Sequence, residues 1–317
     1  MRIPRPLHRA VARTKPLVPD RLWPLLLTLR SLPGTSPMVG RPHWRRAVVL
    51  AAHPDDESLG CGGTLAQLAD AGAELSAVFV TDGDATRGSA RGPATTGRAR
   101  RLEAEAACRV LGVGTSSFLG VPDGEVGAHV DAVAGAITAA VTRASPEALL
   151  LPWFLDGHPD HQALSAALGR AKVPAHLEVW AYETWTPLPA NRIVDVSAVI
   201  DRKRRALAAH ATAHLAFDVG ASLGLSRWRS IHGLMGRGYA EAFLAAPAGE
   251  YLALVRGAAT AGPGPGRAAP GEGEPEPCAP GRAAPGGGEP EAPAPGRAVP
   301  GGGEPEPCAP GRGASRG

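Results

Sequence analysis

The sequence predicts an α/β fold in which a mostly parallel sheet is flanked by helices. One observation is a series of short, almost continuously apolar runs, the pattern of strands that are buried on both faces. A second is that segments with helical periodicity alternate with these runs over short connections. A third is that both ends of the chain lack this pattern, so we expect the folded domain to span residues 46–256.

The elements follow one another regularly along this domain. AVVLAAH at 47–53 is apolar throughout, the next segment places Leu65 and Leu68 on one helical face, and apolar residues spaced by four from Leu102 indicate another helix. In chain order, strands are predicted at 47–53, 75–84, 117–121, 148–153 and 177–185, and helices at 60–72, 96–110, 126–143 and 158–172. This order predicts an open, Rossmann-like sheet, whose ligands bind beyond the carboxyl ends of the strands.

Composition limits the classes of protein that the chain can belong to. Its 317 residues are 44% hydrophobic, which excludes a fully disordered chain, and no apolar run approaches the ~18 residues that a membrane-spanning helix needs. The formal net charge is +3, but residues 1–46 carry ten Lys or Arg and one acid, so the remainder is mildly acidic. An acidic domain argues against nucleic acid as its main ligand.

The two ends differ from the domain in composition. We expect 1–45 to be a basic, Pro-rich arm whose leucines pack on the domain, with peripheral contact to an anionic membrane surface as the alternative. From Gly266 a Gly/Pro-rich unit recurs every fifteen residues, beginning with GRAAPGEGEPEPCAP. Because the unit has no apolar face, 257–317 is predicted to be a disordered tail, and a docking ligand for a partner is the minor reading.

Cysteine usage and the N-terminus bear on the compartment. Two of the four cysteines, Cys61 and Cys108, lie in the domain, and the other two, Cys278 and Cys308, lie in the tail; none of them forms a CxxC motif. The single apolar stretch near the N-terminus contains Pro24, and no cleavage site follows it, so a secretory signal is not predicted. We therefore expect a cytoplasmic protein.

Chemically useful side chains follow the first and fourth predicted strands. The first strand runs into HPDDE at 53–57, and the fourth runs into DGHPDH at 156–161. If the two strands lie side by side, His53, Asp56 and His161 form a set of two imidazoles and one carboxylate. That set suits a catalytic zinc ion with an open position for water, and the adjacent Asp55 is then available as a base.

Each of these motifs also has a simpler interpretation. A His-Pro-Asp sequence after a strand is on its own more often a turn, but two such turns at the ends of two strands of one sheet favour a site. The run Gly60-Cys61-Gly62-Gly63 resembles a dinucleotide loop, yet Leu65 stands where GxGxxG needs a small residue. The sequence also contains neither GxxxxGK[ST] nor GxSxG.

These motifs resemble those of a known enzyme family. AHPDDESLGCGGTLAQLADAGAELSAVFVTDGD followed downstream by GHPDH is similar to the zinc-dependent N-acetylglucosamine de-N-acetylases of the PIG-L/LmbE-like family. The resemblance extends from about residue 46 to about residue 245 and includes RRLE before LGV, LGVPDG and YETWTP. Family members remove an acetyl group from N-acetylglucosamine units of lipids, thiol precursors or antibiotics.

The resemblance implies a role for each motif residue. It implies that His53, Asp56 and His161 hold zinc, with Fe²⁺ as the alternative metal. Asp55 would then take the proton of the metal-bound water that attacks the amide. The other implied roles are a protonated His158 that stabilises the oxyanion, Asp160 that orients the His158 ring, and Arg100 and Asp123 that contact the sugar.

The same resemblance leaves the substrate open. We expect a hydrolase that removes acetyl from an N-acetylated amino sugar, a unit of a glycoconjugate or natural product. The alternatives are an amidase for a larger acyl group or a thiol conjugate, and a non-catalytic sugar-binding relative. Many members carry a Ser-Gln pair where this chain has His210-Ala211-Thr212-Ala213, which affects contacts on the substrate side. Trp180 and Trp185 are interpreted as packing residues, and His210 as an ordinary histidine.

Overall fold

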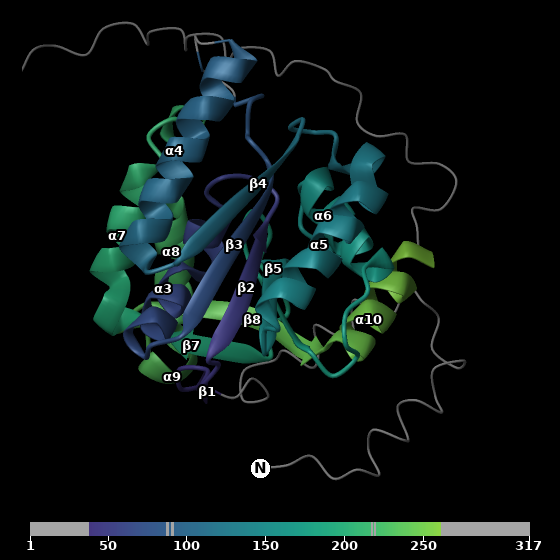
Figure 1. Cartoon of the computed structure of the whole chain (residues 1–317). Coiled ribbons are helices and arrows are strands. Elements are labelled where there is room, and N and C mark those ends of the chain that lie inside the picture. Colours follow the sequence, from purple (N-terminus) through teal and green to yellow (C-terminus); the bar gives the residue numbers. More distant parts are fainter. Residues whose placement is uncertain (1–37, 87–88, 90–91, 217, 219, 261–317) are drawn as a thin grey trace, which may run out of the picture. The chain divides into compact units, whose positions relative to one another are not determined.

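The chain folds around one mixed sheet, as seen in a computed structural model that describes residues 38–86, 89, 92–216, 218 and 220–260. Within these residues eight strands lie in the order β1-β7-β8-β6-β5-β2-β3-β4 (Figure 1). The strands are β1 (Met38–Val39), β2 (Arg46–Ala51), β3 (Glu74–Thr81), β4 (Thr115–Val121), β5 (Ala148–Pro152), β6 (Glu178–Tyr182), β7 (Arg192–Asp195) and β8 (Ala240–Pro247).

Helices follow most of the strands. The α-helices are α3 (Asp56–Asp70), α4 (Pro93–Leu111), α5 (Val130–Ala144), α6 (Pro159–Arg170), α7 (Ile200–Ala209), α8 (Gly220–Arg229), α9 (Ile231–Leu234) and α10 (Ala248–Thr260). The short 3₁₀ helices are η3 (Val126–His129), η4 (Ser197–Val199) and η5 (Ala213–Leu215).

Most strand pairs are parallel, as predicted. β2 pairs in parallel with β3 on one side and with β5 on the other, whereas β8 runs antiparallel between β6 and β7. In the β2–β5 pair, Val48 lies opposite Leu149, so the first and fourth predicted strands are neighbours. The chain builds outward from β2 through β3 to β4 and then returns to β5, which makes the β2–β5 boundary a topological switch point.

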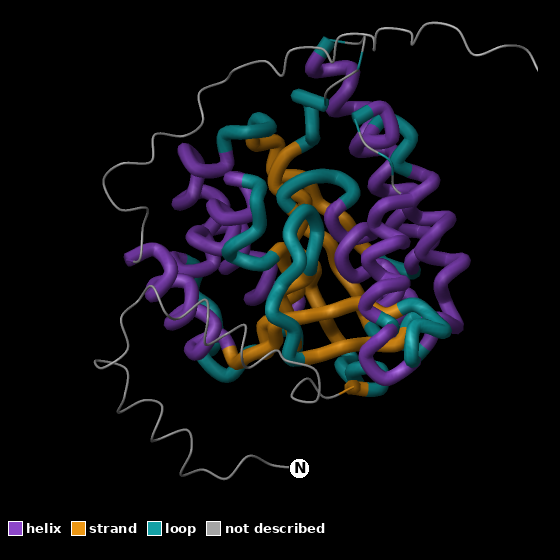
Figure 2. The backbone as a smooth tube through the Cα atoms, turned by 180° about the vertical axis from the view of Figure 1, so that it is seen from behind, coloured by secondary structure: helices purple, strands orange, loops and turns teal. Residues whose placement is uncertain are grey.

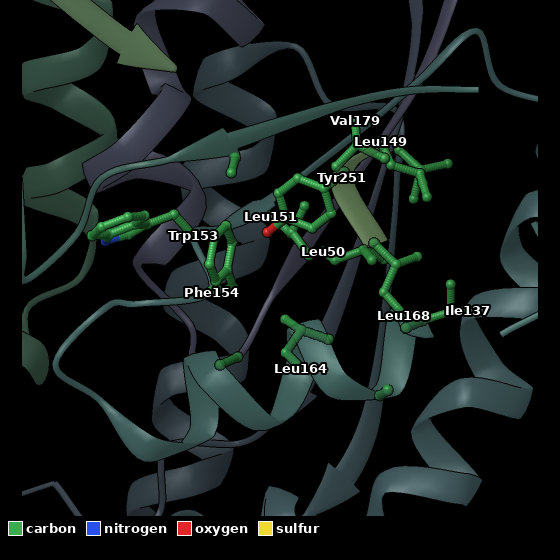
Figure 3. Packing of buried hydrophobic residues seen from close by; sticks show 14 of the residues in the cluster. Leu50, Ile137, Leu149, Leu151, Trp153, Phe154, Leu164, Leu168, Val179 and Tyr251 are labelled. Carbon is green, nitrogen blue, oxygen red and sulfur yellow. The ribbon is translucent and has the colours of Figure 1, made fainter. Parts of the chain in front are cut away.

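Helices cover both faces of the sheet and bury two apolar cores. α3, α4 and α7 lie on one face, and α5, α6 and α10 lie on the other (Figures 1 and 2). Figure 3 shows the second of these cores, in which Leu50, Leu149 and Leu151 of the sheet pack against Leu164 of α6 and Tyr251 of α10. Because β2 is buried from Ala47 onward and β5 over its whole length, they form a rigid base for the residues that follow them.

Two predicted elements differ from the observed ones in a way that matters for the site. The helix predicted at 60–72 begins at Asp56, so Asp56 and Glu57 lie in its first turn. The helix predicted at 96–110 is confirmed within α4, but Leu102, the first of its apolar residues spaced by four, is 58% exposed. The buried face of α4 carries Arg100 near its start and small or compact side chains after it, among them Ala104, Ala107 and Leu111, and this helix packs against α3 and α7.

The Gly-rich run at 60–63, whose sequence argued against a dinucleotide-binding loop, lies inside α3. A Cβ on Gly60 would lie 2.1 Å from Cδ2 of Tyr182 and 2.8 Å from the Glu183 carbonyl oxygen, and one on Gly63 would lie 2.6 Å from Val196. The glycines therefore let the helix approach the sheet closely, which holds its first turn against the ends of the strands.

The predicted terminal segments lie almost wholly outside the described residues. The arm at 1–45 contributes only β1 and the residues after it, and the tail at 257–317 contributes only the end of α10. Among the described helices, none combines the length and the apolar character required to traverse a bilayer. The disordered tail stays a prediction, and so does the arm whose leucines pack on the domain, with membrane contact as the alternative.

Candidate metal centre and active site

The residues of interest meet where β2 and β5 end. Both strands are parallel neighbours, so their carboxyl ends lie at the same edge of the sheet, at the switch point. β2 leads directly into His53 and the start of α3, and β5 leads through a short turn into His158 and the start of α6. Two motifs that are 100 residues apart in the sequence thus form one cluster.

The predicted metal ligands lie around the Asp56 carboxylate. Oδ1 of Asp56 is 3.3 Å from Nε2 of His161, and Oδ2 is 3.7 Å from Nδ1 of His53. Oδ2 also accepts a hydrogen bond from the backbone N–H of His53 at 2.9 Å, which fixes the carboxylate. All three side chains are buried.

One buried atom in this cluster lacks a hydrogen bond. Nε2 of His161 is inaccessible to solvent and finds no hydrogen-bond partner among the described residues. Buried polar atoms are normally paired, so an orphaned imidazole nitrogen beside a carboxylate is the condition that a metal ion would satisfy. The donor set of two imidazoles and one carboxylate therefore fits a divalent cation.

Other groupings at the same edge can also supply ligand atoms. His53, His158 and His161 each have a ring nitrogen within 4.8 Å of the other two, and so do the ligand atoms of His53, Asp123 and Asp160. We favour Asp56 as the anionic ligand, because it lies between His53 and His161 and because the other two carboxylates are engaged by the far nitrogen of His53.

Each of the two predicted histidine ligands is backed by a carboxylate. Nε2 of His53 lies 3.0 Å from Oδ1 of Asp123 and 3.2 Å from Oδ2 of Asp160. Nδ1 of His161 lies 3.0 Å from Oδ1 of Asp156. Carboxylates in this position orient an imidazole and increase its basicity toward a metal.

These carboxylates change the proton affinity of the imidazoles. Burial by itself would lower the pKa of His161, but Asp56 and Asp156 outweigh it and raise that pKa to about 9. Burial is likewise outweighed at His53, whose pKa is raised by Asp123, Asp160 and Asp56. A cation that binds here must therefore displace protons.

Asp55, the predicted base, is buried beside the ligand set. Its backbone φ is 144°, a value that side-chain-bearing residues rarely adopt, and its N–H donates to Oε2 of Glu57 at 3.2 Å. Asp55 precedes the first residue of α3, and its backbone conformation gives the neighbouring carboxylates of Asp55 and Asp56 different surroundings. Burial raises the pKa of Asp55 to about 6, although the Arg100 guanidinium partly offsets the rise.

Arg100 reaches Asp55 from α4 and is itself buried. Nη2 donates to Oδ2 of Asp55 at 2.9 Å and to the Pro54 carbonyl at 2.5 Å, while Nη1 donates to Oγ1 of Thr86 at 2.8 Å. Its guanidinium therefore holds the Asp55 carboxylate in place. The predicted contact between Arg100 and a sugar stays a prediction.

His158 and Asp160 are arranged differently from the prediction. The backbone N–H of Asp160, and not its carboxylate, contacts the His158 ring, donating to Nδ1 at 3.2 Å. The carboxylate instead accepts from the backbone N–H groups of Gly124 and Val126. Burial, together with the positive charges of His53 and His161, lowers the pKa of His158, so a neutral ring is favoured over the protonated one.

Comparison with known proteins places the chain in a family. Residues 48–172 match the family model described as "PIG-L: GlcNAc-PI de-N-acetylase". The chain is 35% identical over 187 residues to 1D-myo-inositol 2-acetamido-2-deoxy-alpha-D-glucopyranoside deacetylase 2 of Saccharopolyspora erythraea, spanning 48% of this chain and 68% of that relative. It belongs to the PIG-L family.

Two further comparisons agree with this membership. Diacetylchitobiose deacetylase of Thermococcus kodakarensis is 30% identical over 190 residues, which cover 52% of this chain and 69% of the relative. The solved N,N'-diacetylchitobiose deacetylase of Pyrococcus horikoshii, in complex with its inhibitor MPG, superposes with a TM-score of 0.53 at 21% identity, covering 65% of this chain and 85% of that one. The likeness to this solved structure supports the α/β fold of the chain.

The PIG-L site includes buried residues that the sequence did not single out. Oε1 of Glu57 accepts from Oγ of Ser58 at 2.6 Å and lies 3.1 Å from Nε2 of His210, while Oε2 accepts from the backbone N–H of Asp55 at 3.2 Å. Burial alone would lower the pKa of His210, but Glu57 raises it. His210 had no metal spacing, and only its tertiary position reveals that it faces the acidic start of α3.

The two tryptophans also separate in space. Trp180 is buried and packs edge-on against Trp44, as expected of a packing residue. Trp185 is 52% exposed, so it is not an interior residue, and its interpretation as a packing residue stays a prediction. It lies beyond the end of β6, in a segment that has left the sheet and entered the edge where the site is built.

Proposed function

We propose that this protein is a metal-dependent hydrolase that removes an acetyl group from an N-acetylated amino sugar of the N-acetylglucosamine type. The observation that carries the proposal is the pairing of a ligand set, His53, Asp56 and His161, with a separately buried carboxylate on Asp55. The named relatives act as deacetylases of such sugars, which supports the same reaction here.

The metal that we propose is zinc, with Fe²⁺ as the alternative. His53, Asp56 and His161 would hold it, and the buried Nε2 of His161 without a hydrogen bond supports this assignment. A divalent ion at that position would supply Lewis-acid polarisation of the acetyl carbonyl and would make water a better nucleophile at neutral pH.

Asp55 is the proposed proton carrier. A carboxylate whose pKa is raised by burial to about 6 accepts a proton from attacking water more effectively than one with an ordinary pKa. Arg100 keeps the carboxylate oriented through the 2.9 Å contact. After the amide bond breaks, Asp55 can return the proton to the departing amine, so that acetate and the free amino sugar are formed.

His158 is proposed to stabilise the developing negative charge as a neutral hydrogen-bond donor. Because its Nδ1 accepts from the Asp160 backbone N–H, the neutral ring carries its proton on Nε2. An N–H donor that is already oriented needs no proton uptake to assist the reaction. Asp123 and Arg100 are retained as proposed sugar contacts, and the Asp123 carboxylate is partly accessible.

The proposed activity is tested by acetate release. Purified protein loaded with zinc is incubated with a panel of N-acetylated amino sugars, free and glycosidically linked, and with matched N-propionyl and longer N-acyl analogues. We expect acetate from at least one sugar and much slower cleavage of the longer acyl groups. Preferred cleavage of a longer acyl group would favour the alternative amidase, and binding without turnover would favour a non-catalytic sugar-binding protein.

The remaining expectations concern the surroundings of the protein. We propose that it acts in the cytoplasm, which the free, buried thiols of Cys61 and Cys108 support. For the basic arm we propose that its leucines pack on the domain, with peripheral membrane contact as the alternative, and nucleic acid is not a proposed partner. Fractionation of cells that express the full chain tests the location directly.

A further inference from the structure

Asp156 lies in the turn between β5 and α6, and its contact with His161 uses only one of its two carboxylate oxygens. It is fully buried, and both carboxylate oxygens are used. Oδ1 accepts from Nδ1 of His161 and from the backbone N–H of His158, both at 3.0 Å. Oδ2 accepts from Oγ1 of Thr184 at 3.0 Å and from the backbone N–H groups of Trp185 and Thr186 at 3.1 Å.

We propose that Asp156 is a positioning residue that couples the metal ligand His161 to the segment 184–186, with one oxygen on each. The proposal rests on the proposed function in one respect, namely that His161 is a metal ligand. It goes beyond that function because it assigns to one carboxylate both the orientation of the ligand and the placement of the segment that carries Trp185.

One oxygen of Asp156 orients the His161 ring. A carboxylate can only accept, so the Nδ1 that faces Asp156 must carry a hydrogen. In the neutral ring, Nε2 then holds the lone pair, and Nε2 is the buried atom that faces Oδ1 of Asp56 at 3.3 Å. The Asp156 contact thus selects the form of His161 that can bind a cation.

The other oxygen of Asp156 holds the segment after β6. β5 and β6 are parallel neighbours, so the turn that carries Asp156 and the segment 184–186 leave the sheet at the same edge. Three donors of that segment converge on one carboxylate oxygen, and the Gly157 N–H returns a bond to Oγ1 of Thr186 at 2.9 Å. The half-exposed Trp185 is therefore held next to the site by the same group that holds His161.

An amide in place of this carboxylate cannot satisfy both sides. All five partners of Asp156 donate, whereas an asparagine has only one acceptor oxygen and presents an NH₂ group on the other side. If the NH₂ faces the segment, it opposes two backbone N–H groups. If it faces His161, it favours the ring form with hydrogen on Nε2, which blocks the metal position.

The first test is the zinc affinity of Asp156→Asn, measured by competition with a chromogenic chelator. We expect the dissociation constant to rise about 10- to 100-fold. Asp195→Asn is the matched control, because the Asp195 carboxylate also accepts from a backbone N–H two residues further on, that of Ser197; its affinity should stay within about twofold of wild type. A folded Asp156→Asn protein with wild-type zinc affinity would overturn the proposal.

The second test uses the wild-type chain and so does not depend on the folding of a variant. Amide hydrogen exchange is compared with and without zinc. We expect zinc to slow exchange at Trp185 and Thr186, whose N–H groups bind Asp156, while exchange at Ser197 is unchanged. Equal exchange at 185 and 186 in both forms would refute the coupling. Neither test uses deacetylation, so a lack of acetate release would count against the proposed function alone.

Discussion

At the scale of single residues, neighbouring carboxylates have different surroundings. Asp56 lies between two imidazoles, which lower its pKa against the opposing effect of burial. At Asp55 burial outweighs the nearby guanidinium, so the pKa of this carboxylate is raised. Residue type and spacing predicted that both belong to one site. Their division of labour depends on the backbone of Asp55, with φ at 144°, which no sequence pattern announces.

This difference leads to a pair of variants. Asp55→Asn keeps the size of the side chain but cannot take a proton, so it should retain zinc and lose on the order of 10² to 10⁴ in turnover. Asp56→Asn replaces an anionic ligand with a neutral one and should weaken zinc affinity itself. Zinc content and acetate release are measured side by side, with zinc then added in excess. If excess zinc rescues Asp55→Asn and not Asp56→Asn, the two roles are reversed.

His210 permits a prediction about pH and stability. Glu57 raises the pKa of His210 in the folded state above the value of about 6.5 in an unfolded chain. The stabilisation from this charge is therefore fully present below pH 6.5 and is lost as the pH rises through the folded-state pKa. The free energy of unfolding of His210→Gln should fall below that of wild type by more at pH 6 than at pH 9.

Urea denaturation of both proteins at the two pH values measures this gap, and the exposed His43→Gln serves as the control. A gap that is constant from pH 6 to pH 9 would mean that His210 contributes by packing alone.

At the scale of elements, the parallel core of the fold was predictable because it depends on local patterns. β2, β5 and the helices after them follow from apolar runs and helical periodicity. The antiparallel β8, which inserts between β6 and β7, was not predicted, because its position is set by pairing between segments that are distant in the sequence, as in the pairs of Glu178 with Pro247 and of Asp195 with Ala240. The buried stripe of α4 was misjudged since its small side chains carry little periodic signal.

The glycines of α3 give a prediction at this scale. Gly60→Ala would place a methyl group 2.1 Å from the Tyr182 ring, whose hydroxyl is tied to the Leu50 carbonyl, and 2.8 Å from a backbone oxygen. Neither neighbour can move freely, so we expect a loss of about 1–3 kcal/mol in the free energy of unfolding. Gly62→Ala is the control, because its nearest contact would be an ordinary 3.5 Å and alanine favours a helix by about 1 kcal/mol. Equal stability of the two variants would contradict the close-approach role of Gly60.

At the scale of the whole molecule, the site joins elements that are distant in the chain. His53 follows β2, Asp56 begins α3 and His161 lies in α6, so one ion would bridge both faces of the sheet. The sequence predicted this convergence only through two similar motifs after two strands. The supporting groups Asp156 and His210 could not be recognised, because an isolated aspartate or histidine becomes informative only when its tertiary partners are known.

Zinc should therefore stabilise the entire fold, and more so at higher pH. A ligand at 100 times its dissociation constant adds about 2.7 kcal/mol, or roughly 5–10 °C in Tm for a domain of this size. His161, with its pKa raised to about 9, and His53, with its pKa also raised, must lose protons before they bind the ion. At fixed zinc concentration the rise in Tm should consequently be larger at pH 8 than at pH 6, and calorimetry in buffers of different ionisation enthalpy should show proton release.

Asp56→Asn should show a smaller rise at both pH values. An equal rise at pH 6 and pH 8, without proton release, would show that zinc binds through groups other than these imidazoles.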